Sequence, residues 1–353
     1  MEAVKLGKTG MMASRIGFGG IPIQRATEDT AVAVVRRCLD LGINFIDTAN
    51  AYTNSEERIG KAISGRRKAV ILATKSTART SERMEKHLQQ SLKRFGVEQI
   101  DLYQFHQVGD LQALDSVLDR NGPMAALQEA RRAGLIKHIG ITSHSMKVAI
   151  EAVKSNRFET IQFPFNFIEC EAADELLPLA RAHDLGFIGM KPLAGGALDN
   201  VTIAFKYILQ FPEVVPIPGV QETREIEEIV RVLDGPWQMT GEEQKEIERL
   251  RVELGSRFCR RCDYCQPCPE GIHISMALTG RNYLKRAPAE WFFSGLFAGI
   301  LEKAAGCTQC GECEGRCPYQ LPIGEMISEQ VEWFRKMQEK IKNDPTHSQD
   351  LKS

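Results

Sequence analysis

Eight of the ten cysteines in this 353-residue chain lie between positions 259 and 317, in two runs of regular spacing. The first run reads C-x2-C-x2-C-x2-C-P, and the second reads C-x2-C-x2-C-x3-C-P. Three thiolates spaced in this way bind three corners of an iron–sulfur cubane, and a fourth cysteine followed by proline supplies the remaining corner, usually of the other cluster. The spacing predicts two 4Fe–4S clusters held by Cys259, Cys262, Cys265, Cys268, Cys307, Cys310, Cys313 and Cys317.

Two other uses of cysteine suit these runs less well. A structural zinc ion takes four ligands and does not need a third cysteine at the same spacing in each run. Disulfides form in oxidising compartments, and the amino terminus lacks the basic segment and apolar stretch that direct export. The first run has two residues before its last cysteine where the ferredoxin pattern has three, which leaves open which cluster Cys268 and Cys317 each bind. Cys38 and Cys170 are expected to be buried or incidental thiols.

A second set of reactive side chains stands where strand-like runs end. Asp47 closes one run (INFID), Lys75 the next (VILATK) and His106 the one after (IDLYQFH), while Tyr52 follows Asp47 in a loop. Each residue alone has an ordinary explanation, as a cap, a solvated cation or a satisfied histidine. Their joint placement at consecutive strand ends instead predicts a cooperating acid–base set.

These four residue types can reduce a carbonyl group together. Tyrosine ionises near pH 10, so its pKa must be lowered if it is to donate a proton near pH 7. A nearby lysine cation favours the phenolate, and an aspartate keeps that lysine charged and oriented. A histidine can orient a carbonyl oxygen by a hydrogen bond, which leaves the tyrosine to protonate the developing alkoxide.

The elements that must position these residues alternate along the first 235 or so positions. Strand-like runs are separated by amphipathic stretches with apolar residues three and four apart. Eight such repeats predict a (β/α)8 TIM barrel rather than an open doubly wound sheet, because GFGG at 17–20 lacks the dinucleotide-binding spacing. The expected strands are 14–18, 43–48, 69–74, 100–105, 136–142, 160–163, 187–190 and 214–217.

The predicted domains follow from these patterns. The barrel should occupy residues 1–236 and a connecting helix residues 237–256. A small α-helical ferredoxin-like 4Fe–4S domain should occupy residues 257–335, and a polar tail residues 336–353. A net charge of −1 gives no reason to expect nucleic acid as a partner, and no apolar run approaches the ~18 residues that span a bilayer. We therefore expect a cytoplasmic protein without a membrane partner.

The sequence resembles the aldo-keto reductases over roughly residues 4–234. The cysteine region is similar to that of a ferredoxin-fused branch of this family, found mainly in anaerobic bacteria and archaea. The resemblance is carried by FIDTANAYTNSEERIGKAI (45–63), ILATK (71–75), IDLYQFH (100–106), IKHIGITSHS (136–145), IQFPFN (161–166), GMKPLAGG (189–196) and VVPIPGV (214–220).

The resemblance implies roles for particular residues. Asp47, Tyr52, Lys75 and His106 correspond to the family's catalytic tetrad, with Tyr52 as general acid. The cofactor is expected to be a nicotinamide dinucleotide bound across the carboxyl face of the barrel. Its expected contacts are Thr142, Ser143 and Gln162 at the carboxamide, Met190 against the nicotinamide, and Pro192, Leu193 and Gly195 over the pyrophosphate.

The resemblance also bears on the choice between NADH and NADPH. Family members that prefer NADPH carry a lysine and an arginine after the last strand to bind the 2′-phosphate. Here Gly219 occupies the lysine position and Glu225 lies at or near the arginine position, with Arg224 one residue away. A carboxylate repels a phosphate dianion and accepts a hydrogen bond from a free ribose hydroxyl. The sequence therefore favours NADH slightly.

Three functions remain in competition. The first is an NAD(P)H-dependent enzyme that interconverts a small-molecule carbonyl and an alcohol. The second is an electron-transfer enzyme, because hydride carries two electrons and a 4Fe–4S centre passes one at a time. A flavin would then connect the substrate to the clusters and to a ferredoxin-like partner, although no flavin motif is present. The third is a redox-sensing nucleotide-binding module, against which the complete tetrad argues.

Substrate specificity cannot be transferred from the resemblance. In this fold it depends on the loops after the strands and on the carboxyl-terminal segment. Here the usual terminal loop is replaced by the cysteine region. The aromatic residues Trp291, Phe292, Phe293 and Phe297 are expected to pack within that region rather than to reach the barrel mouth.

Overall fold

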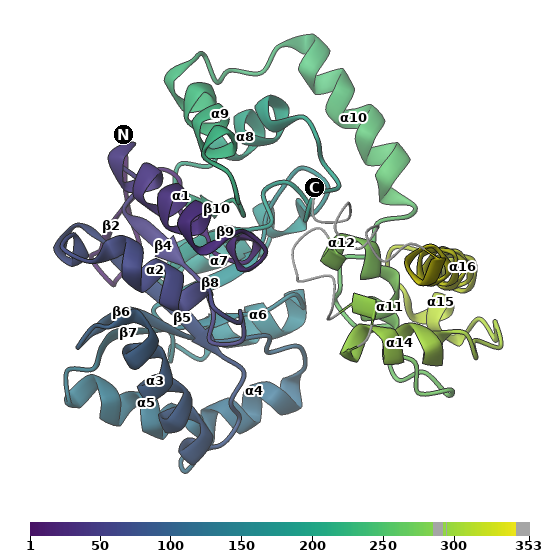
Figure 1. Ribbon diagram of the computed structural model, residues 1–353, viewed down its shortest axis with the longest axis horizontal. Helices are drawn as coiled ribbons and strands as arrows, with labels where there is room; N and C mark the ends of the chain where they lie inside the picture. Colours follow the sequence, from purple (N-terminus) through teal and green to yellow (C-terminus); the bar gives the residue numbers. More distant parts are fainter. Residues whose placement is uncertain (285–291, 294, 344–353) are drawn as a thin grey trace. The chain divides into compact units, whose positions relative to one another are not determined.

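The computed structural model describes residues 1–284, 292–293 and 295–343 (Figure 1). The chain divides into two compact units at Thr240–Gly241. This division falls four residues beyond the expected end of the barrel and assigns the expected connecting helix to the second unit. Trp291 lies outside the described residues.

The first unit contains a parallel eight-stranded sheet in the order β10-β9-β8-β7-β6-β5-β4-β3. Every neighbouring pair is parallel, as right-handed strand–helix–strand connections require. A short antiparallel hairpin of β1 and β2 precedes it. The strands are β1 (Ala3–Lys5), β2 (Met12–Ser14), β3 (Phe18–Gly19), β4 (Phe45–Asp47), β5 (Ile71–Ser76), β6 (Ile100–Phe105), β7 (Ile136–Thr142), β8 (Thr160–Pro164), β9 (Gly186–Met190) and β10 (Val214–Ile217).

The sheet closes on itself through the backbone of its first and last strands. The amide of Gly17 donates to the carbonyl of Pro216, and that of Gly19 to Pro218, both at 2.8 Å. A Cβ atom on Gly19 would lie 2.9 Å from the carbonyl oxygen of Ile217, so only glycine allows this approach. The GFGG segment therefore closes a barrel, and the predicted (β/α)8 fold is confirmed.

Helices surround the barrel strands, as Figure 1 shows. Their ends follow local capping rules. In α3, for example, the Thr80 side chain accepts from the Arg83 amide at the start, and Gly96 adopts a left-handed φ of 65° at the end. The helices are α1 (Glu28–Asp40), α2 (Ser55–Ile63), α3 (Ser81–Phe95), α4 (Leu111–Leu118), α5 (Pro123–Arg132), α6 (Met146–Lys154), α7 (Leu176–Ala182), α8 (Val201–Leu209) and α9 (Thr223–Asp234), with short 3-10 helices at Pro22–Gln24, Arg67–Ala69 and Glu171–Ala173.

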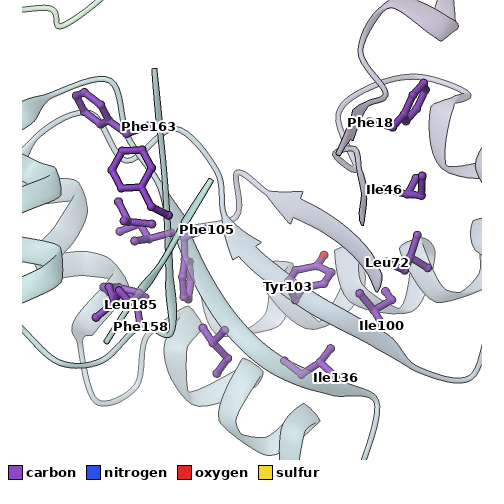
Figure 2. Close-up of a cluster of buried hydrophobic side chains, with 14 of the residues drawn as sticks. Phe18, Ile46, Leu72, Ile100, Tyr103, Phe105, Ile136, Phe158, Phe163 and Leu185 are labelled. Atoms are coloured by element: carbon purple, nitrogen blue, oxygen red, sulfur yellow. The ribbon is translucent and has the colours of Figure 1, made fainter. Parts of the chain in front are cut away.

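Strand residues alternate between two apolar layers because successive side chains point to opposite faces. One layer lies between strands and helices and includes Leu72, Tyr103 and Phe105, which Figure 2 shows among the buried side chains. The other fills the barrel interior and includes Phe45, Ala73 and Leu102 together with side chains of the β1–β2 hairpin. This alternation decides which polar residues face inward at the strand ends.

Two expected elements differ from those observed. The run 14–18 was expected to be the first strand, but Ser14 ends the hairpin strand β2, and β3 begins only at Phe18. Ser14 is held there because its amide bonds to the Asn44 side chain and its hydroxyl to the Ile16 carbonyl. Between β8 and β9, the amphipathic stretch 172–183, which the helical periodicity predicts as one helix, is instead a 3-10 turn followed by the shorter α7.

The second unit is helical and has its own core. Ile272, Leu278, Phe292 and Leu301 are buried in it, and the ring of Phe292 packs against Phe293 and Phe297. Its last helix continues to Asn343, into the segment 336–353 that was predicted to be a polar tail. The helices are α10 (Gly241–Gly255), α11 (Ile274–Leu278), α12 (Gly280–Leu284), α14 (Leu296–Ala304), α15 (Glu312–Arg316) and α16 (Ile323–Asn343).

Candidate active site and candidate cluster sites

The inward-facing side chains at the carboxyl ends of β4, β5 and β6 form a polar group. Asp47 lies two residues after Phe45, Lys75 two after Ala73, and Gln104 two after Leu102, so all three share the interior face. The strand register places Asp47 beside Ala73, and Lys75 directly beside Gln104. His106 follows β6 with the same parity. Strand alternation alone thus brings these residues to one end of the barrel.

Lys75 and Asp47 form a buried ion pair. Lys75 Nζ lies 2.6 Å from Asp47 Oδ2 and donates at 2.6 Å to the carbonyl of Thr48, while Gln104 Nε2 donates to Asp47 Oδ1 at 3.1 Å. Only 1% of the Lys75 side chain is exposed. Burial lowers the pKa of Lys75 and raises that of Asp47, and the attraction between the two charges opposes both shifts. Removing either charge would leave the other buried without its counterion.

Tyr52 and His106 lie next to this pair. Lys75 Nζ is 5.5 Å from the centre of the Tyr52 ring, and the Tyr52 and His106 rings meet edge to face with centroids 5.7 Å apart. Tyr52 is half-buried in the loop between β4 and α2. The four residues that the sequence singled out are therefore neighbours in space.

The environment of His106 favours its neutral form. Burial lowers the pKa of His106 well below its ordinary value, and the cations of Lys75 and Arg79 lower it further. Arg79 also fixes the backbone there, because its Nη2 donates to the carbonyls of His106 and Gln107 at 2.7 and 2.9 Å. Among the described residues, His106 Nδ1 is buried without a hydrogen-bond partner. A neutral imidazole in this position can orient a substrate oxygen.

A second buried carboxylate supports the site, and the sequence analysis missed it. Glu56 accepts from the Thr74 hydroxyl at 2.8 Å and from Arg94 Nη1 at 3.1 Å, and its charge raises the pKa of Lys75. The same Arg94 Nη1 donates to the carbonyl of Asn50 at 2.9 Å. Glu56 and Arg94 thus join the strand that carries Lys75 to the loop that carries Tyr52.

The sequence did contain a signal for Glu56. It precedes Ile59 by three residues and Gly60 by four, so it lies on the buried face of α2. A carboxylate within an apolar stripe requires a buried partner.

Three predicted cofactor contacts meet at the ends of β7 and β8. Thr142 is paired with Gln162 across these strands, and the Ser143 amide donates to the Gln162 carbonyl at 3.2 Å. The hydroxyls of Thr142 and Ser143 bond the backbone of Gln107 and Val108, so they also anchor the preceding loop. In the described part of the chain, Gln162 Oε1 is buried and has no partner. A primary amide such as the nicotinamide carboxamide would supply the missing donor.

The remaining predicted contacts come from the last two strands. Met190 ends β9 and is buried in the barrel interior. Pro192, Leu193 and Gly195 lie in the turn that follows, where Gly195 has a φ of 74°. Gly219 follows β10, and a Cβ atom there would lie 2.9 Å from the Pro22 side chain.

The start of α9 differs from what the sequence suggested for Glu225. Its Oε2 accepts from the amides of Gln221 at 2.7 Å and Glu222 at 2.9 Å, and Glu222 completes a reciprocal capping box. Glu225 therefore has a structural task at the helix terminus. The Arg224 side chain is 79% exposed, and its Nε lies 2.7 Å from Glu222 Oε2.

In the second unit, the two cysteine runs adopt the same local conformation. The residue before the second cysteine is left-handed in both runs, Arg261 at a φ of 60° and Gln309 at 55°. The residue after that cysteine is also left-handed, Asp263 at 59° and Gly311 at 78°. This correspondence makes the two runs a structural repeat of the backbone.

The last cysteine of each run is associated with the other run. Burial raises the pKa of Cys262, and the Cys317 thiolate raises it further, so these two thiols are neighbours. Conversely, a small cavity is lined by Cys268 together with Cys307, Cys310 and Cys313. Arg316 also donates to the carbonyl of Pro267 at 2.7 Å, which ties the ends of the runs together.

The donor set near the first run fits an anionic cluster. Within the described residues, Nε and Nη2 of Arg261 are buried without hydrogen-bond partners. Buried donors of this kind are normally satisfied, so they indicate an acceptor that is not part of the polypeptide. In the described ranges, no group of three or more His, Cys, Asp or Glu side chains is arranged to hold a single metal ion.

Both units match known protein families. Residues 15–202 match the model of the aldo/keto reductase family, and residues 258–322 match that of a 4Fe–4S dicluster domain. The chain is 33% identical over 219 residues to the aldo-keto reductase YhdN of Bacillus subtilis (strain 168), an alignment that covers 57% of this chain and 64% of YhdN. The chain thus spans less than two thirds of the length of that relative.

Solved structures share the barrel. The holo form of the aldo-keto reductase AKR11C1 from Bacillus halodurans has a TM-score of 0.62 at 24% identity, covering 71% of this chain and 96% of its own. An aldo-keto reductase from Klebsiella pneumoniae in complex with NADPH has a TM-score of 0.61 at 23% identity, covering 71% and 95%. At these identities the likeness shows the fold.

Because the family model covers more than half of its length, the chain belongs to the aldo/keto reductase family, and a 4Fe–4S dicluster domain follows its barrel. The resemblance seen in the sequence is confirmed, and so is the prediction of an oxidoreductase of this class. No helix among the described residues is long and apolar enough to cross a bilayer.

Proposed function

We propose that the barrel interconverts a carbonyl compound and an alcohol with a nicotinamide dinucleotide, and that Tyr52 is the general acid and base. The observation that carries this proposal is the buried Lys75–Asp47 pair, at 2.6 Å, beside the Tyr52 and His106 rings. A buried cation next to a phenol is an arrangement that makes the phenol more acidic.

A nicotinamide group suits the residues at the barrel mouth. The unpartnered oxygen of Gln162 would accept from its carboxamide, and Met190 would contact its ring. When bound, the reduced nicotinamide supplies a hydride. In reduction, that hydride goes to the carbonyl carbon and a proton goes to the carbonyl oxygen, which gives the alcohol.

The chain's own side chains handle the oxygen and its proton. His106, neutral near pH 7, orients the carbonyl oxygen, and Tyr52 gives it the phenolic proton. The charge of Lys75 stabilises the phenolate that remains. The charges of Asp47 and Glu56 raise the pKa of Lys75 against the effect of burial, and Gln104 fixes the Asp47 carboxylate.

The start of α9 favours NADH over NADPH. A helix amino terminus normally attracts phosphate, because its free amides point outward. Here the Glu225 carboxylate already accepts from two of these amides, and Glu222 adds a second negative charge. Arg224 is paired with Glu222. A 2′-phosphate would therefore meet repulsion and occupied donors.

The cysteine region is proposed to hold two 4Fe–4S clusters with exchanged fourth ligands. The first cluster would be held by Cys259, Cys262, Cys265 and Cys317. The second would be held by Cys307, Cys310, Cys313 and Cys268. This assignment is supported by the Cys262–Cys317 proximity and by the cavity that Cys268 shares with the second run.

The test of the proposed reaction is the Tyr52→Phe variant, assayed with NADH and simple aldehydes under anaerobic conditions. We expect kcat/KM to fall by about 10²–10⁴-fold, because the proton donor is lost, while NADH binding stays within a few-fold of wild type. Tyr103→Phe is the matched control, because Tyr103 lies on β6 but faces the layer outside the barrel wall. Undiminished aldehyde turnover by Tyr52→Phe would show that another group supplies the proton.

Cofactor preference has its own test. Glu222→Gln should raise kcat/KM for NADPH relative to NADH, because one negative charge is removed next to Arg224. Glu228→Gln, an exposed position further along α9, serves as the control. A wild-type preference for NADPH, or an unchanged ratio in Glu222→Gln, would contradict this part of the proposal.

A further inference from the structure

The two cysteine runs share a backbone conformation but differ in the side chains at equivalent positions. The residue before the second cysteine is Arg261 in the first run and Gln309 in the second, both with a left-handed φ. The residue after that cysteine is Asp263 in the first run and Gly311 in the second. The first run therefore places two opposite charges where the second has none. Charges this close to a cluster act on its reduction potential.

Arg261 has donors without acceptors in the polypeptide. Its Nε and Nη2 atoms are buried and lack hydrogen-bond partners among the described residues. Its guanidinium also acts electrostatically on the Cys259 thiol. A guanidinium carries five N–H donors in a rigid planar fork. Because a buried donor without an acceptor is energetically costly, these two donors indicate an acceptor nearby.

The adjacent arginine has a different environment. The guanidinium carbon of Arg260 lies 3.8 Å from the centre of the Tyr319 ring, which follows the second run. The planar group of Arg260 therefore packs on an aromatic face.

We propose that Arg261 donates hydrogen bonds to the sulfur atoms of the first cluster and raises its reduction potential, while Asp263 acts in the opposite direction. This inference rests on the proposed assignment of two clusters. Reduction adds one electron to a cluster that is already anionic. A cationic donor to its sulfurs stabilises the added charge, and a nearby carboxylate destabilises it.

Asp263 makes the inference sharper, because it lies two residues away and has the opposite sign. Its Oδ1 is buried without a partner in the described ranges, and the residue directly follows Cys262. Neutralising each residue should therefore shift the same potential in opposite directions. A general loosening of the domain would shift it the same way in both variants.

The experiment is an anaerobic redox titration of the full-length holoprotein with dithionite, followed by electron paramagnetic resonance. Arg261→Gln gives the first run the residue that stands at the equivalent position of the second. We expect it to move one of two midpoint potentials to a more negative value and to leave the other unchanged. Asp263→Asn should move that same potential to a more positive value. Gln309→Arg should raise the other potential, which assigns the two signals.

Each outcome has a defined meaning. Unchanged potentials in Arg261→Gln, or shifts of the same sign in Arg261→Gln and Asp263→Asn, would overturn the inference. If Arg261→Gln fails to bind a full complement of iron, Arg261→Lys is titrated instead. It keeps the charge but loses the planar fork, and a smaller negative shift is expected. Wild-type protein with fewer than about eight iron and eight sulfide per chain would refute the two-cluster assignment itself, a separate failure.

Discussion

The active-site end of the barrel and the cysteine region differ in whether their buried charged side chains have partners in the polypeptide. In the barrel, the Lys75 ammonium bonds Asp47 and a backbone carbonyl, and the Glu56 carboxylate bonds Thr74 and Arg94. In the cysteine region, Arg261 and Asp263 have buried polar atoms without partners in the described chain. The polypeptide itself supplies the counterion in the Lys75–Asp47 and Glu56–Arg94 pairs. In the cysteine region, the proposed clusters would supply the acceptor for Arg261.

This difference separates what each part contributes. A site whose charges are already paired is preorganised for a reaction and needs little rearrangement when a cofactor binds. We expect a region with eight thiols and unsatisfied donors to depend on metal for folding as well as for redox chemistry. The predictions below test this contrast.

Removal of iron should have the largest effect, and it should be confined to the cysteine region. After treatment with an iron chelator, amide protons of α11, α14 and the first part of α16 should lose their protection, because the clusters hold the ends of these helices together. Amides of β5 and β6 should stay protected. Hydrogen exchange with mass spectrometry reports both regions in one sample. Retained protection of α11 and α14 without iron would show that the helices fold on their own core.

Breaking the barrel pair comes next. Lys75→Met leaves the Asp47 carboxylate buried without its counterion, which should cost about 3–5 kcal/mol of unfolding free energy and abolish carbonyl turnover. The double variant Asp47→Asn with Lys75→Met should recover much of that stability and remain inactive. Thermal or denaturant unfolding and steady-state assays measure the two effects. A double variant no more stable than Lys75→Met would indicate that the pair's charges are not coupled.

Glu56 should have a smaller effect. Glu56→Gln weakens the bonds to Thr74 and Arg94 and should cost about 1–3 kcal/mol, with a fall in kcat because the Tyr52 loop is less well held. Glu57→Gln changes the neighbouring exposed residue and should be nearly neutral. Equal unfolding free energies for the two variants would show that the bonds of Glu56 to Thr74 and Arg94 do not stabilise the barrel.

The smallest effect concerns His106 and acid. Its folded pKa lies below the unfolded value of about 6.5, so below that pH the unfolded chain binds a proton that the folded chain does not. The wild type should therefore lose stability as the pH falls below about 6.5, by at most about 1.4 kcal/mol per pH unit from this group. His106→Gln should lack that part of the pH dependence. Parallel stability–pH curves for the two proteins would mean that His106 titrates normally.

Much of the barrel could be predicted from the sequence because its information is local. Strand alternation and helical periodicity identify the elements, and the strand ends identify Asp47, Lys75 and His106. The ends of β6, β7 and β10 coincide with the predicted ones. The family comparison supports the assignment of the class.

Other features depend on contacts between distant segments. Gly19 closes the barrel through a contact between β3 and the segment after β10, and its role cannot be recognised without that contact. The bond between Glu56 and Arg94 joins two residues 38 positions apart, on α2 and α3. The sequence suggested only a cofactor contact for Glu225. Its bonds to the amides at the start of α9 depend on the path of the backbone, which the residue type does not reveal. The proposed assignment of Cys317 to the first cluster likewise depends on a contact between distant segments.

The most direct test of the account is the fate of a labelled hydride. Holoprotein is incubated anaerobically with an aldehyde and NADH carrying deuterium at either face of C4, and the alcohol is analysed by mass spectrometry. We predict that one of the two labelled forms delivers one deuterium to the alcohol carbon without loss to solvent, and that Tyr52→Phe forms almost no labelled alcohol. An alcohol whose new hydrogen comes from water would contradict direct transfer in the barrel and would favour a route through a flavin.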